Sequence, residues 1–481
     1  MKGIHRIAGP LLLLLCAGLL IAEVLVRPAV GIANNGDFPK MAGPLALGPE
    51  TGTWESHQFN DFVYTYVRAD RYRYYGGFWS SEYLLLKVAR GLQRILHAGP
   101  RFDIRWLGSV HGAILLLGIG LWIYALDSRW RLWGGLWTVA VWTDVAYVQY
   151  LNSMYTDAVA LVSLVLCAGA GLQVVRRRNS RTMALLLAGA AVLFAASKSQ
   201  HALPALLFIP LFLCFAFWSQ DRAVRTAWVA GSALLVLVAA VLVNRTTDDY
   251  KNEGVFNLVF LRLAPEAPNR LAALRELGLG KEELAYLGMW AFVPNVPLNN
   301  PEWARQFHVR CNYATVLRYY LRHPSVPSRA LYVNLSGQAP LMRPFANQSV
   351  EDGFKPDARA SGFGSWSDLR AWLLERAPWH LILVVLAVLG SSVWLLLRSP
   401  EDRPFAGLAL TMQMLAVLEY GIAVLADAAE TFRHLVLFNV ATDISILMLA
   451  LLIGKVVARR RAGAPAGGVV RSMPGTGANP T

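Results

Sequence analysis

Long apolar stretches of about twenty residues recur along this sequence, and they constrain its fold more than any other feature. An α-helix needs about 20 residues to cross a hydrocarbon core roughly 30 Å thick. The pattern predicts ten such spans, and the alternating pattern of a membrane β-barrel is absent. We therefore expect an all-α polytopic membrane protein with about ten transmembrane helices. The predicted spans are 9–29, 107–126, 132–151, 157–175, 182–197, 200–218, 225–243, 379–397, 404–425 and 434–456.

The charged residues indicate how these spans are oriented. The net charge is +14, but the chain is 55% hydrophobic and only 16% charged, and most of the excess Arg and Lys lies in short loops. Such loops mark the cytoplasmic side of a membrane protein, so the basic charge is no sign of nucleic-acid binding. Both termini are predicted to be cytoplasmic. The basic loops are 127–132, 176–181, 219–225, 398–404 and 455–461.

Two long polar segments, 31–106 and 244–378, then face the outer side. The sequence predicts a transmembrane module over 1–243 that includes the first segment, an extracytoplasmic domain over 244–378, further membrane helices over 379–456 and a disordered tail over 457–481. Within the outer segments, 77–96 has the pattern of a helix lying in the membrane interface, and 268–288 reads as helical. A cleaved signal peptide is the alternative for the first span, but no clear cleavage site follows it.

Ionisable residues are costly inside a bilayer, at about 2.5–3.5 kcal/mol each on insertion scales, and here they gather at the outer ends of the spans. A channel would more often distribute such groups through the depth of the bilayer, and a proton-coupled transporter would favour acids at the midplane. A cluster on one side favours chemistry at the outer surface. The polar residues singled out at this side, ionisable ones together with two amides, are Asn35, Asp37, Glu82, Asp144, Tyr155, Asp157, Lys198, Gln200, His201, Glu419, Asp427, Glu430, Arg433 and His434.

These residue types suit group transfer from a lipid phosphate to a hydroxyl acceptor. Lys198, Arg433 and His434 can bind a phosphate, with the arginine offering two parallel donors. Asp37 in "NNGDFPK" can act as a general base toward an attacking hydroxyl. Tyr155 and Asp157 can hydrogen-bond to sugar hydroxyls.

Each residue also has a structural alternative. Asp37 can belong to a simple Asx turn, and Asp157 can cap a helix. Lys198 can extend to the membrane interface, and Arg433 can form an ion pair with Glu430. For Glu82 and Asp144 the alternatives are an exposed acid at a helix start and a buried hydrogen-bond partner, and the sequence alone does not separate these readings.

The layout resembles the GT-C superfamily of membrane glycosyltransferases, which includes protein O-mannosyltransferases and bacterial cell-surface glycan hexose transferases. The resemblance lies in a first helix followed by a long outer loop with an early acid, in "MYTDAVALVSLV" (154–165), in "SKSQHALPALLFIP" (197–210) and in "ETFRHLVLFN" (430–439). It covers most of 1–243 and the last two helices. Residues 244–378 match no pattern of the family.

The resemblance implies a polyprenyl-phosphate sugar donor, a surface glycan or lipid acceptor and inversion in a single displacement. Asp37 would be the catalytic base. Asn35, Glu82, Tyr155, Asp157, Gln200, His201 and Glu430 would contact substrate, together with the three phosphate-binding residues. We expect no cofactor and no metal, because no Asp-x-Asp motif is present. The Ala, Arg and Gly content favours a bacterial inner membrane.

Two other functions stay open at this point. A lipid-linked sugar flippase or transporter predicts internal repeats and midplane charges. A non-catalytic envelope-assembly scaffold predicts that Asp37 is dispensable. The sequence also predicts that Arg433→Ala weakens donor binding and leaves folding intact.

Overall fold

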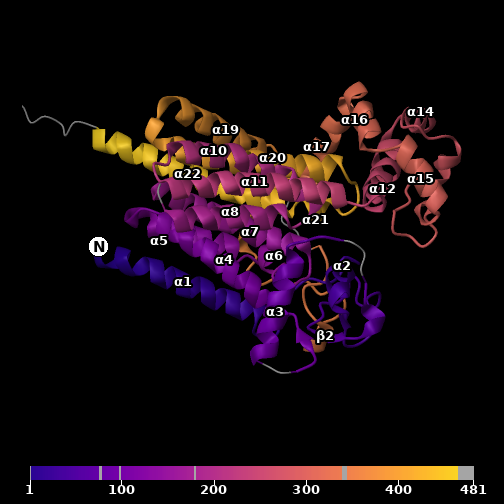
Figure 1. Cartoon of the computed structure of the whole chain (residues 1–481), viewed down its shortest axis with the longest axis horizontal. Helices are drawn as coiled ribbons and strands as arrows, with labels where there is room; N and C mark the ends of the chain where they lie inside the picture. Colours follow the sequence, from indigo (N-terminus) through magenta and orange to yellow (C-terminus); the bar gives the residue numbers. More distant parts are fainter. Residues whose placement is uncertain (1, 75–77, 97–98, 178–179, 338–343, 464–481) are drawn as a thin grey trace, which may run out of the picture.

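A bundle of long apolar helices forms the body of the computed structural model, which describes residues 2–74, 78–96, 99–177, 180–337 and 344–463 (Figure 1). Within these residues, eight helical segments are long and apolar enough to cross a membrane. This confirms an all-α polytopic membrane protein, with fewer full-length spans than the ten predicted. The helices in these segments are α1 (Lys2–Val24), α4 (Arg105–Ala125), α7 (Thr156–Arg176), α9 (Ser199–Ala202) with α10 (Phe208–Trp218), α11 (Arg222–Arg245), α19 (His380–Arg398), α20 (Arg403–Leu425) and α21 (Thr431–His434) with α22 (Val436–Gly463).

Two of the predicted spans differ from the expectation. The third, 132–151, is wrong as one helix, because α5 (Ser128–Trp142) ends and a separate turn α6 (Val145–Val148) follows. Asp144 causes the break: its carboxylate accepts the backbone N–H of Ala146 at 2.9 Å and caps α6. The fifth is α8 (Arg181–Ala195), an apolar helix of 15 residues that is shorter than a full span.

Helix α7 forms the centre of the bundle. Its residues are buried from Thr156 to Val174, because α4, α8, α20 and α22 all pack against it. The α4–α7 contact is close because glycines meet there: a Cβ added at Gly169 would clash with the carbonyl oxygen of Gly118. Small residues permit such close approach between membrane helices. Helix α7 is thereby held in close contact with α4.

The first outer segment folds over the ends of these helices. It contains α2 (Phe38–Ala42), α3 (Glu82–Leu96) and a small antiparallel sheet of β1 (Leu47–Pro49), β2 (Thr65–Arg68) and β3 (Phe102–Asp103), in the order β1-β2-β3. The exposed residues of α3 include Leu84, Val88, Leu92 and Ile95. This apolar stripe fits a helix lying in the membrane interface, as the sequence predicts.

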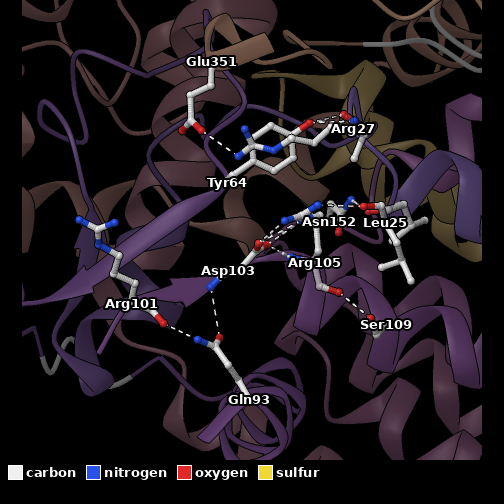
Figure 2. Close-up of polar contacts among 12 residues, drawn as sticks. Leu25, Arg27, Tyr64, Gln93, Arg101, Asp103, Arg105, Ser109, Asn152 and Glu351 are labelled. Carbon is white, nitrogen blue, oxygen red and sulfur yellow. Dashed lines mark hydrogen bonds and ion pairs between the residues drawn. The ribbon is translucent and has the colours of Figure 1, made fainter. Parts of the chain in front are cut away.

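Polar contacts fix the sheet to the bundle and to the second outer segment (Figure 2). The guanidinium of Arg105, at the start of α4, donates to both oxygens of the Asp103 carboxylate and also to the carbonyl of Leu25 at 2.9 Å. Arg27, just after α1, forms an ion pair with Glu351 at 3.0 Å and covers the ring of Tyr64. The chain leaving α1 is therefore held from both outer segments.

The second outer segment divides into two parts. The first part has its own apolar core and lies beyond one end of the bundle (Figure 1). Its helices include α12 (Asp248–Asn257), α13 (Ala264–Glu266), α14 (Arg270–Glu276), α15 (Pro301–Arg310) and α16 (Tyr313–Arg322), with a π-helical turn at Leu258–Leu263. Of the helical stretch expected over 268–288, only α14 and a 3₁₀ turn at Glu282–Tyr286 form.

The other part of this segment returns to the bundle through α17 (Ser325–Gly337) and α18 (Ser365–Arg376). Between these helices, the backbone N–H of Ala33 donates to the carbonyl of Ala346 at 2.8 Å, so 344–364 supports the loop that carries Asp37. On α18, the buried Arg370 forms an ion pair with Asp443 of α22 at 2.8 Å. The second outer segment thus supports the loop that carries Asp37 and is itself fixed to the bundle.

Both described termini lie at one end of the bundle, and α2, α12 and α21 lie at the other (Figure 1). This agrees with an arrangement in which the two ends of the chain share one side of the membrane. The disorder predicted from 457 is wrong as far as Gly463, where α22 ends. The remainder of the predicted tail, 464–481, lies outside the described residues.

Candidate functional site

Asp37 lies on the turn between α1 and α2, and a neighbouring residue makes that turn. The side-chain oxygen of Asn34 accepts the N–H groups of Gly36 and Phe38, each at 2.9 Å, and Gly36 has a φ of +112°. An Asx turn therefore exists, as the structural alternative for this stretch predicts. Because Asn34 forms it, the carboxylate of Asp37 remains available for other contacts.

Arg433 holds three carboxylates that come from distant parts of the sequence. Its guanidinium lies 3.1 Å from Asp37, 3.1 Å from Asp157 and 3.0 Å from Glu430. The side chain of Arg433 is only 5% exposed, and its guanidinium carbon lies 5.1 Å from the ring centre of Tyr155. We name Asp37, Tyr155, Asp157, Glu430 and Arg433 the arginine cluster.

Local backbone geometry places Glu430 at the cluster. Glu430 precedes α21 and has a φ of +47°, in the left-handed region that non-glycine residues seldom occupy. The amide of Asn35 donates to its carboxylate at 2.7 Å. Strained residues of this kind persist where the surrounding structure holds them, often at functional sites.

The charge balance around Asp37 is set by three cations. Burial alone would raise the pKa of Asp37, but the charges of Lys40, Arg433 and Lys198 together hold it well below the usual range of an aspartate. Lys40 lies 2.8 Å from the Asp37 carboxylate. Burial lowers the pKa of Lys40, yet its pairing with Asp37 leaves that pKa raised overall. Asp37 is therefore a carboxylate at any physiological pH.

The basic residues predicted from the sequence lie beside this cluster. Lys198 directly precedes α9, is buried, and has no hydrogen-bond partner for its ammonium among the described residues. His201 pairs with Glu419 at 2.9 Å, and its other ring nitrogen lies 4.0 Å from Asp157. His434 follows Arg433 on α21 and lies within electrostatic range of Lys198 and Asp37. An ammonium without a hydrogen-bond partner, on a side chain that is otherwise buried, is a ready site for an anion.

Three other predicted residues have different surroundings. Glu82 is fully buried against His111 at 3.1 Å, so the structure does not bring it into the arginine cluster, and the exposed acid expected as its alternative is also wrong. Asp144 accepts the N–H groups of Trp366 and Ser367 and so ties α18 to the break after α5. Gln200 lies on α9 and makes no described contact with the arginine cluster.

A cavity of about 230 Å³ adjoins the cluster at Lys40. Aromatic rings, hydroxyls and acids line it, and it lies at the outer end of α11 and the start of α12. Lys40, Tyr250 and Glu253 were not among the residues expected from the sequence, although Lys40 stands within the "NNGDFPK" stretch. The lining residues are Lys40, Tyr74, Phe78, Trp79, Ser199, Leu242, Arg245, Thr246, Thr247, Asp249, Tyr250 and Glu253.

The lining combines two kinds of chemistry. Aromatic faces with carboxylates and hydroxyls can hold a sugar ring, and Lys40 and Arg245 can hold a phosphate. Burial raises the pKa of Glu253, which therefore keeps its proton to a higher pH than an ordinary glutamate. Over the described residues, no group of three or more His, Cys, Asp and Glu side chains has the arrangement of a metal site. The expectation of no metal remains a prediction.

Comparisons with known proteins show which family the chain belongs to. Among solved structures, the chain is similar to the apo form of the Archaeoglobus fulgidus oligosaccharyltransferase, with 11% identity and a TM-score of 0.40. The similarity covers 94% of this chain and 51% of that one, so the chain spans about half the length of that protein. No curated protein sequence matches. The family described as the YfdI N-terminal transmembrane domain matches residues 1–467. This chain therefore belongs to the YfdI N-terminal transmembrane domain family, a GT-C-like family, in agreement with the resemblance noted in the sequence.

Proposed function

We propose that the chain is a membrane glycosyltransferase that moves a sugar from a polyprenyl-phosphate donor to a hydroxyl of a cell-envelope glycan or other surface acceptor. One observation carries the proposal: Arg433 holds Asp37, Asp157 and Glu430 together beside an aromatic and acidic cavity at the membrane boundary. The proposed location is a bacterial inner membrane, with the site on the extracytoplasmic side and both termini in the cytoplasm.

In the proposed reaction, the acceptor hydroxyl gives its proton to Asp37 as its oxygen bonds to the anomeric carbon. The bond from that carbon to the phosphate oxygen breaks, and the electron pair leaves with the lipid phosphate. A single displacement of this kind inverts the anomeric configuration. The residues stabilising the departing phosphate would be Arg433, Lys198 and His434, and such electrostatic stabilisation is commonly the largest catalytic contribution.

The ion pairs of Arg433 suggest how donor binding and base activation are coupled. With Arg433 3.1 Å away and Lys40 2.8 Å away, Asp37 is a weak base, because its proton affinity is strongly reduced. A donor phosphate that takes over part of the hydrogen bonding of Arg433 and Lys40 would raise that affinity. Asp37 would then accept a proton only when donor is in place.

The cavity offers a place for the transferred sugar. It opens between Leu242 near the outer end of α11, a predicted membrane span, and Tyr250 and Glu253 of α12. A lipid tail can lie along the membrane-facing side of α11 while its phosphate approaches Lys40 and Lys198. The sugar would then meet Tyr250 and Glu253, within reach of Asp37.

Detergent-solubilised protein supplied with radiolabelled polyprenyl-phosphate hexoses and an envelope extract tests this proposal. We expect one donor to be consumed and label to appear covalently in a glycan or lipid product. Because detergent micelles have no separated compartments, a flippase or a scaffold would form no covalent product. Asp37→Asn should abolish the product, and Asp70→Asn, at an 87% exposed carboxylate, is the matched control.

A further inference from the structure

Helix α16 has an exposed apolar stripe that the core of its own domain does not cover. Tyr313, Leu317 and Leu321 recur at every fourth residue and are 41%, 58% and 74% exposed. Side chains at that spacing are neighbours on one side of a helix. Val316 and Tyr319 lie on another side, which is buried in the domain core. The stripe is therefore a second apolar surface, beyond the one that the fold of the domain requires.

Helix α16 is fixed at the level where a membrane span ends. The hydroxyls of Tyr313 and Tyr320 donate to the backbone carbonyls of Ala426 and Leu425, at 3.1 and 3.2 Å. Leu425 is the last residue of the candidate span that contains α20. In Figure 1, α16 stands out to one side of this end of the bundle. Because Leu317 follows Tyr313 by one helical turn, the apolar stripe begins at this anchor and lies at the membrane boundary.

The sequence around α16 is basic. The interval 303–350 contains six arginines and neither Asp nor Glu. On α16 itself, Arg318 and Arg322 are exposed, and neither forms an ion pair with another described residue. Glu276 of α14, which approaches the end of this helix, pairs with His323 at 2.8 Å. The exposed side of α16 thus combines leucines with positive charge.

We propose that α16 docks on the outer surface of the membrane by binding anionic phospholipids. Leu317 and Leu321 lie among the upper parts of the acyl chains, and Arg318 and Arg322 lie at the phosphates. A helix in the interface plane binds more strongly as its buried apolar area and the anionic lipid content increase. A second copy of the chain fits this surface less well, because a symmetric contact would bring the same arginines together. This docking does not depend on the proposed sugar transfer.

Fluorescence quenching by spin-labelled lipids tests the docking in the full chain. Leu321→Cys carries a bimane label in a Cys214→Ala background, since the other three cysteines are buried. Single chains are placed in nanodiscs that contain a lipid with its quencher near the headgroup. The membrane is either phosphatidylcholine or an equal mixture of phosphatidylcholine and phosphatidylglycerol. Arg275→Cys, at an exposed position on α14, is the matched label position.

We expect strong quenching of the Leu321→Cys label in the anionic nanodiscs, weaker quenching in phosphatidylcholine, and little quenching of the Arg275→Cys label. Adding Arg318→Gln and Arg322→Gln to Leu321→Cys should lower the ratio of docked to undocked label by about fivefold for each arginine. Arg270→Gln with Arg275→Gln removes the same charge from α14 and should leave that ratio unchanged. Each of these side chains is exposed, so we expect all variants to fold, and thermal melting checks this.

Leu317→Cys carries the label if Leu321→Cys does not fold. Equal quenching at the α16 and α14 positions would overturn the docking, and equal quenching in the two membranes would overturn the choice of anionic lipid. A water-soluble quencher distinguishes other occupants. Shielding of the label only in nanodiscs that hold two chains would assign the surface to a second copy. Shielding only after addition of envelope proteins would assign it to another polypeptide, and either result would overturn the proposal.

Discussion

The guanidinium of Arg433 lies 3.1 Å from the carboxylate of Asp37, which joins the last part of the chain to the first outer loop. This contact brings the proposed base and the proposed phosphate-binding arginine into one site. Until substrate arrives, Arg433 lowers the proton affinity of Asp37. In turn, Asp37 occupies hydrogen-bond donors of Arg433 that a phosphate would need.

The first prediction concerns Asp37→Asn. The amide has the shape of the carboxylate but cannot accept the proton of the acceptor hydroxyl. We expect turnover to fall by about 10²–10⁴-fold, the usual range for a lost general base. Donor affinity should be unchanged or higher, because Arg433 loses a competing carboxylate. Initial rates and equilibrium donor binding measure the two effects separately, and full turnover in a folded mutant would reject the base assignment.

The same contact predicts how stability depends on pH. The folded pKa of Asp37 is depressed, so its contribution to stability is present above its unfolded pKa of about 3.9 and is lost as pH falls through the folded value. Wild type should therefore melt at a higher temperature than Asp37→Asn at pH 7. The difference should shrink below about pH 4. A pH-independent difference would mean that the charge of Asp37 does not stabilise the fold.

The Arg433 substitutions should separate folding from catalysis. Removal of this buried side chain leaves Asp37, Asp157 and Glu430 without their shared cation, and breaking a buried pair typically costs about 3–5 kcal/mol. We therefore expect Arg433→Ala to lower the melting temperature, whereas the sequence alone predicted intact folding. Arg433→Lys should fold better but bind donor weakly, because lysine lacks the two parallel donors.

A double variant checks the cause of that instability. Adding Asp157→Asn to Arg433→Ala removes one of the stranded charges and should recover part of the lost melting temperature. No recovery would show that packing around Arg433, rather than uncompensated charge, accounts for the loss.

Lys198→Met should affect donor binding with little effect on stability. The ammonium of Lys198 makes no hydrogen bond with the described residues, so its loss removes only charge interactions, among them those with Asp37 and Asp427. A charged contact to phosphate is typically worth about 1.5–3 kcal/mol, which corresponds to roughly a 10–150-fold rise in donor KM. The exposed Lys281→Met is the control. An unchanged donor KM would exclude Lys198 from the phosphate site.

Much of the bundle and part of the site can be predicted from the sequence. The length of an apolar stretch and the cost of placing an ionisable side chain in the bilayer can both be read from the local sequence. Eight predicted spans correspond to full-length apolar helices. Asp37, Asp157 and Arg433 were singled out as polar groups at one end of the bundle, and the structure brings them together.

Other features depend on contacts that no local pattern shows. The third span is broken because Asp144 accepts N–H groups from Trp366 and Ser367 on a distant segment. Glu82 is directed into the core by His111, which lies on another helix. The contributions of Tyr250 and Glu253 could not be predicted, since residues 244–378 have neither span-like hydropathy nor a recognisable motif.

The last prediction concerns Asp427, which follows α20 at the end of the bundle that holds the candidate site. Burial raises its pKa to about 6, while hydrogen bonds from Ala429 and Ala428 and the charge of Lys198 limit the rise. The folded state therefore binds more protons than the unfolded state between about pH 4 and 6, and stability falls as pH rises through that window. Above that pH window, the ionised carboxylate costs about 1–3 kcal/mol of folding stability.

Asp427→Asn keeps an oxygen for the N–H of Ala429, which lies 2.9 Å from the carboxylate, and removes the charge. We expect this variant to melt above wild type at pH 8 and to lose that advantage as the pH falls below 4. Asp70→Asn, at an exposed site, should show no such crossover. A variant less stable than wild type at pH 8 would mean that the ionised carboxylate is favourably paired, with Lys198 as one candidate because its charge acts on Asp427.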